Sequence, residues 1–552
     1  MVGTTDTVKG RPQSGQLHRS VGFWGLTFIA LGSIIGSGWL LGALGAAKSA
    51  GPASLISWIL ATAMLMVLAL IHAELGAAYP VAGGTARFPY FAFGTLAGFS
   101  AGWAAYLQAV ALAPIEVEAS ISYLASTSWA KHHLTLLHPN GTLTLVGLLI
   151  ASAAMLVFTI VNLFGAKLLS SSNNVLVTWK LIVPILAIIV ILSLSFHPSN
   201  FHAGGGFMPY GMHGVFAALP LGVVFSLQGF EQAVQMAGEA RNPRKHLSRA
   251  IISAMCIGAA VYILLEVAFI GGLAPKNLLH GWANPIGASD FGPYYTLAIA
   301  AGAGWLATIL LIDAVVSPGD TALIYLATSS RLSYALGKEE VLPSKLTETN
   351  KRGVPMYSII LAFVIGEIMF LPFPSWSSLV TLITGATAIM YAFAPVSLAA
   401  LQARDPDRPR AYRAPFPKVL NPIGFASANL IIYWGGFEAM WKLLAALFVG
   451  RLLFEIALRR SKDVRRTDID WRAASWIWPW LIGMTIIGLL GRYGKGAHDA
   501  LPNWIDLLVV IGFSLVIFYY AVSLAMESGK IQAAVETEER QLAEAPALNL
   551  PG

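Results

Sequence analysis

The stretch GSIIGSGWL, residues 32–40, decides the fold because it places three glycines and two serines inside a strongly apolar segment. Glycine costs about 1 kcal/mol relative to alanine in a helix interior. Two explanations are open from this stretch alone. Gly32, Gly36, Gly38 and Gly42 have the four-residue spacing of small residues that pack helices closely together. Alternatively, the glycines unwind the helix where the chain crosses the bilayer.

The composition around this stretch is that of a membrane protein. The chain has 552 residues, of which 56% are hydrophobic and 11% charged, whereas a soluble domain carries about 25% charged residues. A single cysteine, Cys256, excludes an internal disulfide and a cysteine-based metal cluster. The first 20 residues are polar, and the apolar run after them is too long for a signal peptide. We therefore expect a polytopic membrane protein without a signal peptide.

Because about 20 apolar residues span a bilayer, the apolar segments predict fourteen spans. They lie near residues 22–47, 54–77, 97–126, 143–164, 174–196, 214–237, 248–272, 296–330, 355–372, 377–401, 423–438, 442–458, 474–491 and 504–526. With a cytoplasmic N-terminus, 27 of the 35 lysines and arginines fall on the inner side. The positive-inside rule then predicts that both termini are cytoplasmic. The basic loops would face anionic lipid, so the basic pI does not indicate nucleic-acid binding.

A second interruption lies five spans after the first. In FSLQGFEQ, residues 225–232, Gln228, Gly229 and Glu231 interrupt an apolar run. Interrupted segments at matching positions of two halves indicate a transporter built on an inverted repeat. Unwound backbone at membrane depth has to line a cavity or bind a ligand.

The two breaks together offer sites for opposite charges. Free N–H groups near Ser37 and Gly38 would bind a carboxylate, because a helix N-terminus favours anions. Backbone carbonyls around Phe225 and Ser226 would face an ammonium group. An amino acid zwitterion carries one group of each kind. No strand precedes Gly36, so the glycines are not a dinucleotide-binding fingerprint.

Several motifs resemble those of the amino acid–polyamine–organocation (APC) superfamily of permeases. They are GSIIGSGWLLG followed by AGP, ELGAAYPVAGG (74–84), FSLQGFEQAVQMAGEARNPRKHLSRAI (225–251) and SRLSYALGKEEVLP (330–343). The resemblance covers about residues 22–420, and the extra spans are similar to the fourteen-span branch that includes aspartate–proton symporters. It implies an all-α LeuT-like fold, with inverted repeats of spans 1–5 and 6–10, and alternating access.

This organisation divides the chain into five expected parts. They are a cytoplasmic N-terminal tail (1–20), a transport core of ten spans (21–402), a proline- and arginine-rich cytoplasmic linker (403–422), spans 11–14 (423–526) and a cytoplasmic C-terminal tail (527–552). No cofactor is expected, and the oligomeric state is open.

The resemblance also implies a substrate site. Its residues are Ser33, Ile34, Ile35, Gly36, Ser37 and Gly38 on the first span, and Phe225, Ser226, Leu227, Gln228 and Gly229 on the sixth. Phe225 matches an aromatic gate over the substrate. Gln228 replaces the usual apolar residue, so it either faces a polar or acidic substrate side chain or satisfies unwound backbone. Glu231 caps freed backbone or carries a proton, and spacing adds Tyr106 to the site.

Ionisable side chains inside the spans are costly and mark functional sites. Proton-coupled relatives place a lysine on the fifth span where a LeuT-like fold holds its second sodium ion, and Lys180 matches that position. Its expected neighbours are carbonyls near Gly32 and Ile35, and Ser317 or Asp320 on the eighth span. Lys180 is therefore a candidate proton carrier, although a standing ion pair with Asp320 would favour a structural role. A snorkelling side chain is a further alternative.

Two more carboxylates, Glu116 and Glu118, follow Pro114 on the third span. They cannot share one helix face, so we expect one to line a cavity and the other to meet another helix.

The sequence thus predicts proton-coupled uptake of a small neutral or acidic amino acid across the cell (inner or plasma) membrane. An exchanger or a sodium-coupled symporter is the alternative, and lysine in the sodium position argues against sodium. A channel or a receptor is a third class. The chain carries neither an HExxH nor a GxSxG motif and no cluster of metal ligands, which argues against an enzyme.

Overall fold

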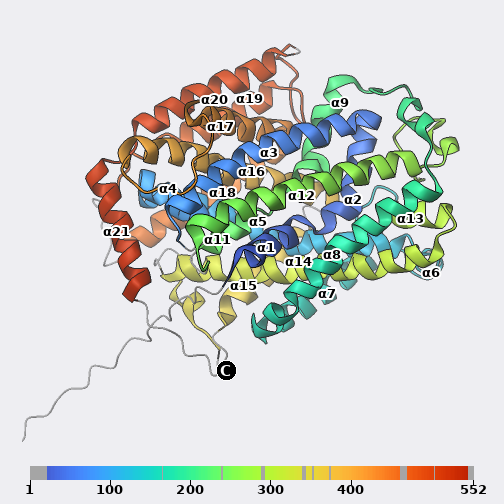
Figure 1. The fold of residues 1–552 in the computed structure, drawn as a ribbon, viewed down its shortest axis with the longest axis horizontal. Helices are drawn as coiled ribbons and strands as arrows, with labels where there is room; N and C mark the ends of the chain where they lie inside the picture. The colour runs from blue at the N-terminus through green and yellow to red at the C-terminus, as the bar shows by residue number, and fades with distance from the viewer. Residues whose placement is uncertain are drawn as a thin grey trace, which may run out of the picture.

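A computed structural model shows a bundle of helices that lie side by side (Figure 1). It describes residues 21–81, 83–164, 166–237, 240–287, 292–338, 343–350, 354–371, 375–460, 469–502 and 504–544. Within these residues, 8 helical segments are long and apolar enough to cross a membrane, and four shorter helices are apolar. These twelve segments cover the predicted spans except 11 and 12, which are also helical but more polar.

The first five predicted spans fall on six long helices, because the first span is split in two. These helices are α1 (Phe23–Ile34), α2 (Ser37–Ala50), α3 (Ser54–Ala78), α5 (Thr95–Ala125), α7 (Leu145–Leu163) and α8 (Ala166–Leu194). Shorter helices connect them: η1 (Gly51–Ala53), α4 (Gly84–Phe93), α6 (Ser128–His133) and η2 (Pro198–His202). The α5 helix packs against α14 and α16 of the second half, which places it at the centre of the bundle.

The sixth predicted span is also broken. It contains α9 (Gly211–Ala218), the irregular segment η3 (Leu219–Val223), α10 (Val224–Leu227) and α11 (Glu231–Gln235). The next spans are α12 (Pro243–Gly272), α14 (Gly304–Lys338), α15 (Met356–Met369) and α16 (Trp376–Arg404), with η5 (Pro275–Leu278), α13 (Pro293–Ala300) and η6 (Ser344–Thr347) between them. Predicted span 8 began too early, because a turn with Gly302 at φ +75° separates α13 from α14.

The C-terminal helices pack on the outside of α16. They are α17 (Pro417–Trp434), α18 (Phe437–Arg460), α19 (Ile477–Leu490) and α20 (Ile505–Ser523). The nearly continuous apolar run 423–458 is divided at Gly436, whose φ is +84°. A Cβ atom on Gly436 would lie 2.7 Å from the Cα atom of Gly494. Glycine is therefore required there both by the backbone conformation and by the close approach.

The polar segment after α20 forms a further helix, α21 (Ser528–Glu544), which packs against α4 (Figure 1). Its apolar side chains Ile531 and Val535 are buried. Glu539 forms an ion pair of 2.5 Å with Arg408, whose Nε atom donates to the carbonyl of Ala78 at 2.9 Å. The C-terminal segment is therefore tied to both the linker and the end of α3.

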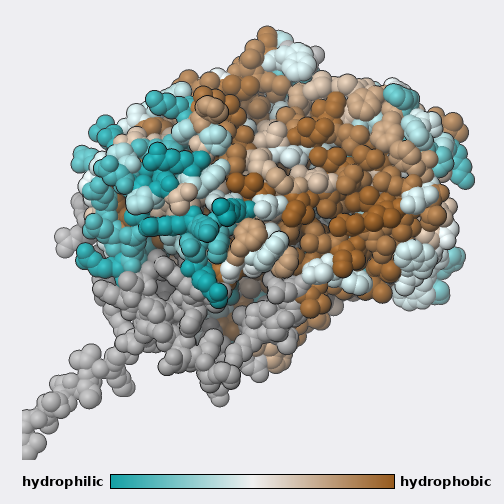
Figure 2. All heavy atoms as spheres, in the orientation of Figure 1, coloured by the Kyte–Doolittle hydropathy of each residue, from teal (hydrophilic) through white to brown (hydrophobic). Residues whose placement is uncertain are grey.

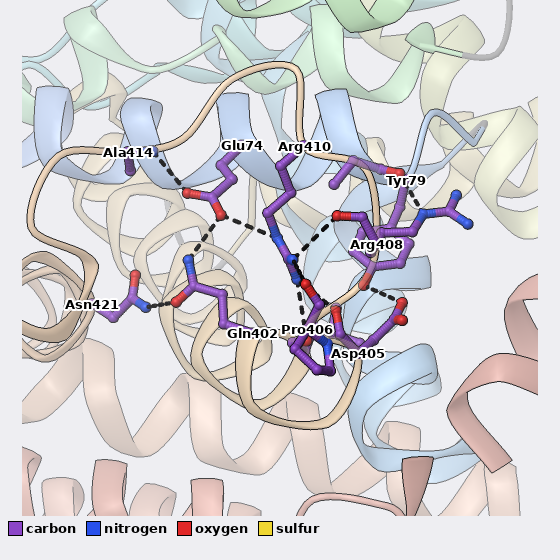
Figure 3. A network of polar contacts seen from close by, with 11 residues as sticks. Glu74, Tyr79, Gln402, Asp405, Pro406, Arg408, Arg410, Ala414 and Asn421 are labelled. Carbon is purple, nitrogen blue, oxygen red and sulfur yellow. Dashed lines mark hydrogen bonds and ion pairs between the residues drawn. The ribbon is translucent and has the colours of Figure 1, made fainter. Parts of the chain in front are cut away.

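The proline- and arginine-rich linker is held against the same end of α3 (Figure 3). The carboxylate of Glu74 accepts hydrogen bonds from Gln402 at 2.8 Å and from the backbone N–H of Ala414 at 2.7 Å. Arg410 forms an ion pair with Glu74 at 3.4 Å. Buried polar groups of this kind need all their partners, so the linker has a fixed path.

The surface shows two kinds of region (Figure 2). A broad apolar face covers the middle and right of the view, and a hydrophilic region lies at the end that carries α4 and α21. Large apolar side chains such as Leu149, Ile189, Leu264 and Val516 are exposed. An apolar surface of this extent is unfavourable in water and suits contact with lipid.

Candidate functional site

The first span is broken at Ile35 and Gly36, between α1 and α2. Ile35 has φ −93° and ψ 85°, and Gly36 has φ −118° and ψ −141°. The carbonyl of Ile34 accepts a hydrogen bond from the hydroxyl of Tyr262 at 2.8 Å. A side chain thus satisfies a backbone group that the break frees from the helix.

The second break, residues 228–230, lies directly against the first. Gly229 has φ +118°, a conformation that favours glycine. A Cβ atom at this position would lie 2.6 Å from the carbonyl carbon of Ser33 and 2.7 Å from the nitrogen of Ile34. The two broken helices therefore meet backbone to backbone, as expected if they form one site.

The other glycines of the opening stretch serve close packing. A Cβ atom on Gly32 would lie 2.8 Å from Val177, and one on Gly38 would lie 2.8 Å from the Cα atom of Ser226. A Cβ atom on Gly42 would likewise lie 2.7 Å from the hydroxyl of Ser226. Both explanations of the stretch thus apply, the packing one to these three glycines and the unwinding one to Gly36.

A small cavity lies where the two breaks meet. Its free space is that of about one water molecule. It is lined by Ser33, Ile34, Gly36, Gly38, Gln108, Leu112, Glu116, Phe225, Gln228, Thr321 and Tyr325. Six of these residues belong to the predicted substrate site. Of the remaining predicted residues, Ile35, Ser37, Ser226, Leu227 and Gly229 adjoin the lining along the chain.

Tyr106 is buried but does not belong to the lining. Its ring stacks on Trp103 with centroids 5.5 Å apart. Tyr106 was predicted to belong to the substrate site, but the face of α5 towards the cavity carries Gln108, Leu112 and Glu116 instead. These three residues follow each other at intervals of four, which places them on one side of the helix. This spacing is the feature of the sequence from which the three residues could have been predicted to face the same site.

The side chain of Glu116, which belongs to α5, binds the N-terminal end of α2. Its Oε2 atom accepts a hydrogen bond of 2.8 Å from the backbone N–H of Ser37, and its Oε1 atom accepts one of 3.1 Å from the Ser37 hydroxyl. Glu116 is thus the carboxylate of the pair that lines the cavity. Neither carboxylate oxygen of Glu118 has a hydrogen-bond partner among the described residues.

Phe225 lines the cavity and packs against Trp376 of α16. Their rings meet edge to face, with centroids 5.9 Å apart and planes at 86°. The indole N–H of Trp376 donates to the hydroxyl of Ser37 at 3.2 Å. The aromatic residue predicted as a gate therefore has a partner on α16 that is linked to the first break.

Glu231 is surrounded by hydrogen-bond donors. Its carboxylate accepts from the backbone N–H of Gly229 at 2.9 Å, from Gln108 at 3.0 Å and from Tyr391 at 2.5 Å. The hydroxyl of Tyr325 lies at 3.5 Å. Of the two predicted roles, the bond to Gly229 matches the capping of freed backbone.

Gln228, by contrast, has an amide nitrogen without a hydrogen-bond partner in the described part of the chain. The side chain is buried and lines the cavity. A buried amide donor costs free energy unless it finds a partner. Its position thus favours a ligand contact over support of the unwound backbone.

Lys180 reaches from α8 to the end of α1. Its Nζ atom lies 3.0 Å from the carbonyl oxygen of Gly32, 2.8 Å from the hydroxyl of Thr321 and 2.7 Å from a carboxylate oxygen of Asp320. Among the described residues, no hydrogen bond from Lys180 to the carbonyl of Ile35 is found. The ammonium group therefore sits in a set of oxygen ligands supplied by α1 and α14.

Of the two candidates on the eighth span, Asp320 contacts Lys180 and Ser317 does not. The hydroxyl of Ser317 donates to Asp313 at 2.6 Å, one helical turn earlier on α14. Asp313 also accepts from the indoles of Trp39 at 3.1 Å and Trp179 at 2.7 Å. Of the two alternatives that the sequence left open for the partner of Lys180, the structure selects Asp320, because the carboxylate of Asp313 takes the hydrogen bond of Ser317.

The sequence model of a family described as amino acid permease matches residues 21–451. The chain belongs to this family. The permease is 33% identical over 530 residues to the glutamate/serine transporter AimA of Bacillus subtilis, covering 96% of this chain and 98% of the relative.

Other relatives carry further transporter names. The permease is 33% identical over 515 residues to the aspartate-proton symporter of Bacillus subtilis, covering 92% of this chain and 97% of the relative. It is 26% identical over 468 residues to the branched-chain amino acid permease BcaP of the same organism, covering 84% and 97%. The permease is thus a multi-pass membrane transporter of the APC superfamily and not an enzyme.

Proposed function

We propose that the permease imports an amino acid together with protons by alternating access, with the substrate held between the two broken helices. The α-carboxylate would bind the start of α2, and Phe225 with Trp376 would cover the bound molecule. The single observation that carries the choice of protons over sodium is the ammonium group of Lys180 among the oxygens of Gly32, Thr321 and Asp320. A fixed positive charge there leaves no need for a sodium ion.

The lining of the cavity supports a small polar substrate. Among the described lining residues, Glu116 is the one charged side chain, and no lysine or arginine is present. An acidic substrate side chain would need a cation or several donors, and Gln228 offers one free donor. The two relatives at 33% identity are named for glutamate, serine and aspartate. We therefore propose a serine-like substrate, with acidic amino acids as the competing class.

Reconstitution into liposomes tests the proposal. Radiolabelled L-serine, L-glutamate and L-aspartate are offered with an outside-acid pH gradient, with a sodium gradient or with neither. We expect serine to accumulate only with the pH gradient, and a protonophore to abolish the accumulation. Accumulation that follows the sodium gradient would contradict proton coupling, and the absence of uptake of any amino acid would contradict the substrate class.

Exchange is a second candidate function, and the ion pair between Lys180 and Asp320 favours it. A permanent ion pair holds helices together, and exchange of one amino acid for another needs no proton to cross the membrane. Preloading the liposomes with unlabelled amino acid distinguishes the two modes. Uptake that needs internal substrate and ignores the pH gradient would identify an exchanger.

The orientation in the membrane is part of the proposal. The sequence assigns most basic residues to loops on the same side as the linker and the C-terminal segment, and we propose that this side faces the cytoplasm. Single cysteines introduced at exposed positions Lys276 and Arg413, in a Cys256→Ser background, test it. A membrane-impermeant thiol reagent applied to intact cells should label position 276 and spare position 413.

A further inference from the structure

Glu116 places a carboxylate where the proposed substrate would place its own. The start of α2 offers the backbone N–H and the hydroxyl of Ser37, and both donate to Glu116. A Cβ atom on Gly36 would lie 2.9 Å from Oε1 of Glu116 and 3.1 Å from the hydroxyl of Thr321. The site for an anion at the first break is therefore occupied by the protein itself.

The size of the cavity leads to the same conclusion. With Glu116 bound to Ser37, the free space between the breaks admits about one water molecule. An amino acid that binds α2 through its carboxylate has to displace the Glu116 side chain from these donors. The two carboxylates compete for one helix N-terminus, and like charges at such short range disfavour ionisation of both.

The charged neighbours of Glu116 influence whether its carboxylate is ionised, and therefore how it competes with the substrate. Lys180 on α8 and Asp320 on α14 are the charged groups that act on it, and the phenols of Tyr262 and Tyr325 face it from α12 and α14. Lys180 is in direct contact with Asp320. Among the described residues, Glu116 thus has no cation in direct contact that would keep it ionised beside a second carboxylate.

We propose that Glu116 is a proton-binding competitor that links substrate entry to proton uptake, an inference that rests on the proposed function. A proton from the outer solution binds a carboxylate oxygen of Glu116. The neutral side chain gives up the N–H of Ser37 to the α-carboxylate of the substrate. When the substrate leaves on the inner side, Glu116 releases this proton to water and returns to Ser37.

The inference predicts a specific pH dependence of binding. If one proton enters with each amino acid, the affinity falls about tenfold for each pH unit on the alkaline side. In Glu116→Gln the side chain cannot titrate, so the affinity should lose this dependence and exceed that of the wild type at alkaline pH. Glu118→Gln is the matched control, because Glu118 lies on the same helix and is equally buried; it should keep the dependence.

The experiment measures L-serine binding to purified wild type, Glu116→Gln and Glu118→Gln by calorimetry over a series of pH values. A pH indicator in weak buffer measures proton uptake directly, which should be about one proton per serine in the wild type and none in Glu116→Gln. Chromatography and thermal melting check that each variant is folded. Glu116→Met, which also lacks a titratable group, replaces Glu116→Gln if that variant does not fold.

The outcomes separate this inference from the proposed function. A wild type that binds serine with proton uptake, together with a Glu116→Gln variant that keeps it, overturns the role of Glu116 alone. A wild type that binds serine without proton uptake overturns the inference and leaves amino acid transport standing. A wild type that does not bind L-serine contradicts the serine-like substrate of the proposed function itself.

Discussion

The Nζ atom of Lys180 lies 2.7 Å from a carboxylate oxygen of Asp320, and both side chains are buried. The pair joins α8 to α14, while the bond from Lys180 to Gly32 adds α1. One ammonium group therefore connects the broken first helix to a helix of each half. Removal of this group should affect both the stability of the bundle and the response to a pH gradient.

Lys180→Ala is expected to abolish gradient-driven accumulation while leaving substrate binding and exchange measurable. Breaking a buried ion pair leaves an uncompensated charge, which costs about 3–5 kcal/mol in the free energy of unfolding. The double variant Lys180→Ala with Asp320→Asn removes that charge and should recover most of the stability without the accumulation. Thermal unfolding in detergent and uptake into liposomes measure the two effects separately. Normal accumulation by Lys180→Ala would refute the coupling role.

Valine at Gly38 should remove transport although the protein still reaches the membrane. The larger side chain has no space, because even a Cβ atom would lie 2.8 Å from the backbone of Ser226. Gly512→Val on α20 is the control, since nothing lies within 4 Å of a Cβ atom there. Uptake relative to the amount of protein in the membrane is the measurement. Transport with unchanged affinity in the Gly38 variant would show that the close packing of α2 on α10 is not needed for transport.

Gln228→Leu should change the substrate preference. The amide nitrogen is the donor in the cavity lining that lacks a partner among the described residues, and leucine has a similar size without it. Loss of a hydrogen bond to a polar substrate costs about 0.5–1.5 kcal/mol, and up to about 3 kcal/mol if the acceptor is charged. Competition of serine, glutamate and alanine for uptake measures the preference. The same order of preference in the variant would reduce Gln228 to backbone support.

Tyr391→Phe should destabilise the second break. The hydroxyl donates to Glu231 at 2.5 Å, and its loss leaves a buried carboxylate with fewer donors, at a cost of about 1–3 kcal/mol. Tyr325→Phe is the comparison, because its hydroxyl lies 3.5 Å from the same carboxylate and should matter less. Thermal unfolding of the two purified variants measures the loss of stability in each. An equal loss in both would contradict the expectation that the Tyr391 hydroxyl matters more.

The breaks were predictable from the sequence because glycine and buried polar residues are unsuited to a lipid-facing helix. Gly36 and Gly229 lie at the breaks as expected, and Lys180 lies beside Gly32. The bounds of the broken segments differ by a residue or two, since Ser37 and Gly38 already belong to α2. The local sequence determines where a helix is interrupted, so the positions of the two breaks follow from the residue types found there.

The partners of the site residues were not predictable in the same way. Glu116, Thr321 and Trp376 lie against the first break from α5, α14 and α16, which are distant in sequence. Helical periodicity groups Gln108, Leu112 and Glu116 on one face, but it does not tell which neighbouring helix that face meets. Ser317 shows the limit, because its actual partner, Asp313, lies on its own helix.

The helix α21 has a practical consequence for handling the protein. Its apolar side chains Ile531 and Val535 are buried, and Glu539 holds the linker through Arg408. A shortened chain that ends at Ser523, with a purification tag or fluorescent protein joined there, would expose the apolar surface that Ile531 and Val535 cover and would release Arg408. Expression vectors for this permease should therefore keep residues 524–544 intact and carry any tag beyond them, separated by a flexible spacer.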